Sequence, residues 1–226
     1  MSSRGVHPTW RSRLLRLPIN RDSRNGILTT MPYILIILAA ATRIIPHMNN
    51  AAAITAAAIF SGFALPKKQA FLVPLAARFV TDIFLGFFAW QLMVAVYAAH
   101  ILGVFLGMWV KKNNTVIPAT TTGEPESIPG SQIAQATSGM TAQKWIKIII
   151  SSLGASISFF LITNFAFLYG SYQHTMSGIL QSYANGLPFL RGTVVGDVGY
   201  TAGIFAIYFA ASFASTRVTK YQTASI

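Results

Sequence analysis

The sequence predicts an all-α, polytopic membrane protein: a bundle of six transmembrane helices with a short cap helix at its outer end. Of the 226 residues, 53% are hydrophobic and only 10% are charged, whereas soluble domains average about 25% charged residues. Six apolar runs follow one another along the chain, and lysine and arginine gather in alternate connections between them, as in membrane proteins.

The N-terminal half is predicted to hold a leader and four helices. Residues 1–30 are polar and arginine-rich and are expected to be disordered; a second interpretation, that translation begins at Met31, stays open. The four helices of segment 31–112 correspond to these apolar runs: 32–46, 51–65, 70–88 and 90–110. Because a span needs about 20 residues, the first two runs are short, and a tight turn between them is expected to lengthen both.

The C-terminal half is predicted to hold two more helices. Segment 113–143 is rich in Thr, Ser, Gly and Pro and reads as a flexible cytoplasmic linker. Segment 144–216 contains two runs, at 145–169 and 197–214, with an outer cap at 170–196 between them. Residues 177–183 favour a short cap helix, because glycines and Pro188 follow closely. Residues 217–226 form a cytoplasmic tail.

The distribution of basic residues predicts the orientation. If the chain crosses six times, eight basic residues fall on one side: Lys67, Lys68, Lys111, Lys112, Lys144, Lys147, Arg217 and Lys220. The opposite loops hold only Arg191. The positive-inside rule therefore predicts a multi-pass protein of the cell inner membrane with both termini in the cytoplasm.

Four charged residues interrupt the apolar runs: Arg43, Arg78, Asp82 and Asp197. Charges inside a bilayer are costly, face the protein interior and commonly mark a binding or transport site. Arg78 and Asp82 are four residues apart and share a helix face. We therefore expect an acid within salt-bridge distance of Arg43 or Arg78.

The charged residues share a depth with other polar residues. A rise of about 1.5 Å per residue places them between mid-bilayer and the outer surface. The predicted ligand-binding residues are Arg43, His47, Arg78, Asp82, Asn164, His174, Arg191 and Asp197. An alternative, in which these groups only form salt bridges that fix the bundle, stays open.

Other intramembrane residues favour packing over ligand contact. His100 lies alone in the middle of its run and is interpreted as bonded to a neighbouring helix. Gly103 and Gly107, like Gly199 and Gly203, are four apart, a spacing that lets helices approach closely.

Several functional classes are disfavoured. The net charge of +12 comes from residues that flank apolar runs, so nucleic-acid binding is not expected. The chain has no cysteine, its histidines lack metal-ligand spacing, and two arginines would repel a cation. No phosphate-binding loop or nucleophile motif occurs. We therefore expect no enzyme activity, no metal and no cofactor.

Four stretches carry a resemblance to a known family. They are Ala41 to His47, Asp82 with Phe84 and Gly86, the pair Asn164-Phe165, and the cap from His174 to Asp197. Over residues 31–212 they resemble an uncharacterised bacterial six-helix integral-membrane family. That family is similar to the substrate-binding S components of energy-coupling factor (ECF) transporters.

The resemblance implies capture of a small polar solute, such as a micronutrient, at the outer face, and its delivery with a T component and ATPases. It implies that the pocket is lined by Arg43, His47, Asp82, His174 and Asp197. One feature departs from S components, which often dock through an Ala-x-x-x-Ala face on the first helix: Ala39, Ala40 and Ala41 are contiguous here. The second hypothesis is a structural or accessory subunit of a larger complex, surrounded by membrane lipids.

Overall fold

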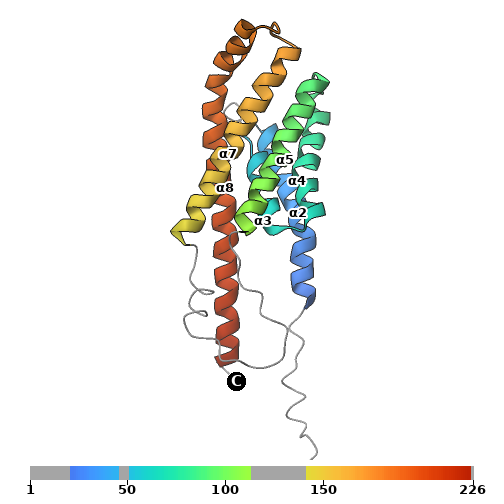
Figure 1. Ribbon diagram of the computed structural model, residues 1–226. Coiled ribbons are helices and arrows are strands. Elements are labelled where there is room, and N and C mark those ends of the chain that lie inside the picture. The colour runs from blue at the N-terminus through green and yellow to red at the C-terminus, as the bar shows by residue number, and fades with distance from the viewer. Residues whose placement is uncertain (1–20, 46–50, 113–140, 225–226) are drawn as a thin grey trace, which may run out of the picture.

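A computed structural model describes residues 21–45, 51–112 and 141–224 (Figure 1). This part of the chain is helical and contains no strand, which confirms the all-α prediction. Its elements are α2 (Arg21–Ile44), α3 (Ile54–Ala64), α4 (Lys67–Leu85), α5 (Trp90–Lys112), α7 (Ala142–Ala166), the 3-10 turn η1 (Phe167–Tyr169) and α8 (Met176–Ala224). Each predicted apolar run has its own α-helix.

Three segments are long and apolar enough to cross a membrane. They are Trp90–Lys112, Ala142–Tyr169 and Met176–Ala211. Two further apolar helices are shorter, Thr30–Ile44 and Ile54–Ala64. Length and composition thus favour association with a membrane, and the count of six spans stays a prediction.

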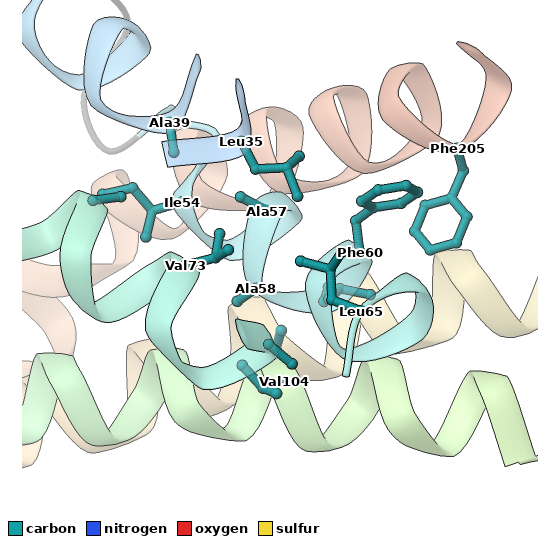
Figure 2. Packing of buried hydrophobic residues seen from close by; sticks show 14 of the residues in the cluster. Leu35, Ala39, Ile54, Ala57, Ala58, Phe60, Leu65, Val73, Val104 and Phe205 are labelled. Carbon is teal, nitrogen blue, oxygen red and sulfur yellow. The ribbon is translucent and has the colours of Figure 1, made fainter. Parts of the chain in front are cut away.

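Helix α3 is a short buried helix at the centre of the bundle (Figure 2). Its 11 residues rise about 16 Å, roughly half of the 30 Å hydrocarbon core of a bilayer. Helix α3 therefore does not fill its predicted run of 51–65, and the turn that was expected to lengthen the run lies outside the described residues. The helix ends because Leu65 is extended, with ψ 162°, as a residue before proline tends to be; Pro66 then caps α4.

Glycines bring α3 and α5 into backbone contact. A Cβ atom on Gly107 would clash with the Ile59 carbonyl, and one on Gly62 would clash with the Val104 carbonyl. The predicted packing of the Gly103/Gly107 face is thereby confirmed. Gly199 and Gly203 differ, because a Cβ atom there would meet nothing within 4 Å among the described residues.

Aromatic side chains join α3 to α8. The rings of Phe60 and Phe205 meet edge to face, with centroids 5.2 Å apart (Figure 2). Both side chains are almost fully buried. This contact anchors the middle of α8 against the central helix.

The outer cap is not a separate short helix. Residues from Met176 onward belong to α8, which continues through Pro188 for 49 residues. Gly186, which was expected to help end the cap helix, is a close-packing position instead and lies against the Asn164 side chain. Gly196 lies equally close to Ala51. A proline removes one backbone donor from a helix, and here that loss does not end α8.

The helix ends divide between the two ends of the bundle (Figure 1). The start of α2, the end of α5, the start of α7 and the end of α8 lie toward the same end. The connection from α7 to α8 lies at the opposite end. Arg43 lies in the last turn of α2.

Candidate ligand site

The site is built around one buried carboxylate. Asp82, in the last turn of α4, is 0% exposed. One oxygen accepts from Arg43 Nη1 at 2.7 Å. The other accepts from Arg78 Nε at 3.2 Å and from the Tyr97 hydroxyl at 3.0 Å. The expected pairing of an acid with these arginines is confirmed, and the hydrogen bonds of Asp82 join α2, α4 and α5.

Local structure holds the two arginines in place. Arg78 lies one helical turn before Asp82, so their side chains meet on one face. Arg43 also donates to the Thr81 hydroxyl, which in turn donates to backbone carbonyls of its own helix. The Arg78 guanidinium lies over the Phe88 ring, 5.4 Å from its centroid, a cation–π arrangement.

The arginines offer more donors than Asp82 accepts. Within the described residues, the one hydrogen bond donated by Arg78 comes from Nε and goes to Asp82. A guanidinium carries five N–H groups, so its terminal nitrogens are left for another acceptor.

Asp197 belongs to a second polar group. It is 1% exposed on α8 and accepts from the Ser156 hydroxyl of α7 at 2.7 Å. In the described ranges it forms no ion pair with an arginine. Hydroxyl groups of Ser156 and Thr55, rather than an arginine, are therefore the hydrogen-bond partners of Asp197 in the described residues.

Two cavities adjoin the arginines. The smaller is about 210 Å³ and the larger about 600 Å³. Four residues line both: Arg43, Arg78, Phe159 and Thr193. His100 and Asp197 also line the smaller cavity. Asn164 lines the larger one, together with Tyr172, Asn185 and other residues of segment 170–196.

Two predicted site residues, His174 and Arg191, stand apart from these cavities. His174 Nε2 lies 2.8 Å from the Leu168 carbonyl oxygen, and its ring packs on Tyr169. Arg191 is exposed on α8. Neither residue lines either of these two cavities. His47, another predicted site residue, lies outside the described residues. The structure therefore brings together Arg43, Arg78, Asp82, Asn164 and Asp197.

The structure adds residues that sequence reasoning missed, above all Tyr97 and His100. His100 was expected to bond to a neighbouring helix, but neither of its ring nitrogens has a hydrogen-bond partner in the described part of the chain. The two residues are three apart and share a face of α5. That spacing was the available signal. The described residues hold no cluster of three or more His, Cys, Asp or Glu suited to a metal ion.

Comparison with known proteins gives one match. A family model described as "Family of unknown function (DUF6580)" matches residues 24–220. No match was found among curated proteins or among solved structures.

Proposed function

Because the chain belongs to a family of unknown function (DUF6580), we propose its function from the geometry of its site. The protein is an integral membrane protein that binds a small polar solute in the cavities beside Arg43 and Arg78. The predicted resemblance to an uncharacterised family is confirmed by this membership. Its likeness to S components of ECF transporters is part of the proposal.

The observation that carries the proposal is the placement of two guanidinium groups at the wall of an interior cavity. Their side chains are 14% and 12% exposed, and they share one fully buried acid. Buried charges are costly unless paired and hydrogen-bonded, and intramembrane charges commonly mark a site. A solute that accepts hydrogen bonds would satisfy the donors that Asp82 leaves over.

We further propose that the protein is the solute-capturing subunit of an inner-membrane transporter. The basic residues favour cytoplasmic termini, and the cavities adjoin the last turns of α2 and α4, away from the end of the bundle where α8 ends (Figure 1). The pocket then faces outward. The chain carries no nucleotide-binding motif, so the energy comes from partners, a T component with ATPases.

One observation favours a second function, an accessory subunit of a membrane complex. Gly199 and Gly203 form a small-residue face on α8 that meets no neighbour in the described chain. Such faces allow a second helix to approach closely. Affinity purification from membranes separates the two: ATPases and a T component support the first function, and another complex supports the second.

Native mass spectrometry of the purified full chain tests solute binding. We expect a bound small molecule on the wild type that is lost in Arg78→Gln. Arg191→Gln is the matched control, because Arg191 is exposed and lines neither cavity; this variant keeps the molecule. Equal occupancy of all three proteins would contradict the proposed site.

A further inference from the structure

His100 is a buried histidine without a partner. Its residue is 5% exposed, and both ring nitrogens lack a hydrogen-bond partner among the described residues. The ring packs beside Phe159, with centroids 5.4 Å apart. Buried polar groups in proteins are nearly always hydrogen-bonded, so each exception requires an explanation.

The position of His100 supplies that explanation. It lines the smaller cavity together with Arg43 and Arg78. An imidazole can donate through one ring nitrogen and accept through the other. A molecule in this cavity would therefore reach the guanidinium groups and the unpartnered imidazole together.

The donors around the cavity favour a carboxylate. Guanidinium groups match the planar, two-oxygen geometry of a carboxylate. The His100 ring can donate a further hydrogen bond to the same carboxylate. The two guanidinium groups share one acid, Asp82, so their charge exceeds that of Asp82 by one, which matches one carboxylate. Asp197 lines the same cavity and adds repulsion against any further negative group. The site thus favours a molecule with a single carboxylate.

The larger cavity favours an apolar body behind that carboxylate. It shares the arginines and Phe159 with the smaller cavity. Its other lining residues include Phe88, Leu92, Phe160 and Leu190. Pockets of this kind fix orientation with a few polar groups and enclose the rest of the ligand with apolar and aromatic side chains.

We propose that His100 is a ligand-binding residue and that the solute is a monocarboxylic acid with an apolar body. The carboxylate is bound by Arg43 and Arg78 and accepts a hydrogen bond from the His100 ring. The inference rests on the proposed function and narrows it to one chemical class. Aromatic acids and short fatty acids share this chemistry.

Thermal unfolding of the purified full chain in detergent tests the chemical class. The probes are sodium phenylacetate and sodium hexanoate, with phenylacetamide as the uncharged match of the first. We expect at least one acid to raise the melting temperature in a concentration-dependent manner and the amide to have no effect. The acid that gives the larger shift in melting temperature shows whether the apolar body is aromatic or aliphatic. Equal shifts with acid and amide, or no shift with either acid, would overturn the carboxylate assignment.

Variants of two histidines test the role of His100. His100→Phe removes both unpaired nitrogens and keeps a ring beside Phe159. We expect an unchanged or higher melting temperature without ligand, and an affinity for the acid weaker by about tenfold or more, the effect of losing one hydrogen bond to a charged group. His100→Gln, which keeps an N–H donor, retains part of the affinity.

The matched control is His174→Phe, the same change at a histidine that lines neither cavity. It loses the bond to the Leu168 carbonyl, so it lowers the melting temperature and keeps the acid-induced shift. An undiminished shift in His100→Phe, or loss of its fold without ligand, would overturn the role of His100.

The two variants distinguish a failure of this inference from a failure of the proposed function. A co-purified molecule that disappears in Arg78→Gln but remains in His100→Phe would overturn this inference and leave the proposed function standing. A molecule that remains in both variants would overturn the two together.

Discussion

Asp82 is the acid that pairs with both arginines of the site. Its two oxygens accept hydrogen bonds from Arg43, Arg78 and Tyr97. Removing one partner of a buried ion pair costs about 3–5 kcal/mol, because an uncompensated charge is left behind. Here a single substitution would leave two guanidinium groups without their acid.

Asp82→Asn is therefore expected to lower the free energy of unfolding by about 3–5 kcal/mol, measured by chemical denaturation in mixed micelles. Asp197→Asn is the control. Asp197 forms hydrogen bonds with the Ser156 and Thr55 side chains and pairs with no arginine in the described ranges, so about 1 kcal/mol is expected for each hydrogen bond that is weakened. Equal losses in the two variants would contradict the central role of Asp82.

Part of this site followed from the sequence. The spacing of Arg78 and Asp82 predicts a shared helix face, and the depth of Arg43 predicts its pairing with an acid. Tyr97 and His100 could not be assigned in the same way. Helix α5 is apolar around its whole circumference, so its sequence does not show which face meets α4. His174 lines neither of the two cavities, and depth alone does not tell a cavity wall from the outer turn.

At the scale of elements, the contact between α3 and α5 determines how tightly the centre packs. Gly62 and Gly107 each lie against the backbone of the opposite helix. Neither helix can accept a methyl group there unless the two move apart. The short α3 is consequently held between neighbours rather than by its own length.

Gly107→Ala is expected to destabilise the protein by about 1–3 kcal/mol, the usual cost of overpacking. Gly199→Ala is the matched change at an open helix position. This change is expected to leave the free energy of unfolding unchanged or to raise it by about 0.5–1 kcal/mol, because alanine has a higher helix propensity than glycine. Melting temperatures of the two variants in the same detergent check the ordering, and the reverse ordering would contradict the packing.

Element boundaries were harder to predict than element identity. Each apolar run became a helix, yet the cap and the last run merged into α8. Glycine and proline in a sequence mark either a break or a close contact. Only the packing partners, Asn164 for Gly186 and Ala51 for Gly196, decide between the two.

At the scale of the whole molecule, the arrangement of helix ends agrees with the charge pattern. The end of α5 and the start of α7 lie at one end of the bundle, opposite the connection from α7 to α8 (Figure 1). Lys111 and Lys112 close α5, and Lys144 and Lys147 lie in the first two turns of α7. By the positive-inside rule, that end is predicted to face the cytoplasm.

Single-cysteine labelling in whole cells tests this orientation, because the chain has no cysteine of its own. Gln173→Cys, between η1 and α8, is expected to react with a membrane-impermeant maleimide in intact cells. Ser131→Cys, in the segment that the sequence predicts to be cytoplasmic, is expected to react only after permeabilisation. The opposite pattern would invert the topology and place the cavities on the inner side.

Arg43 takes part both in the packing of α2 and in the wall of the cavities. Its guanidinium group ties α2 to α4 through Asp82 and Thr81, and it also lines both cavities. If the protein binds the proposed solute, solute occupancy and the docking of α2 would be thermodynamically linked, since any group that changes the bonds of this arginine changes both. A partner that touches α2 would sense whether the pocket is full without contacting the solute. The same linkage limits evolution of the site, because no substitution of Arg43 can alter affinity without altering the packing of the helix that carries it.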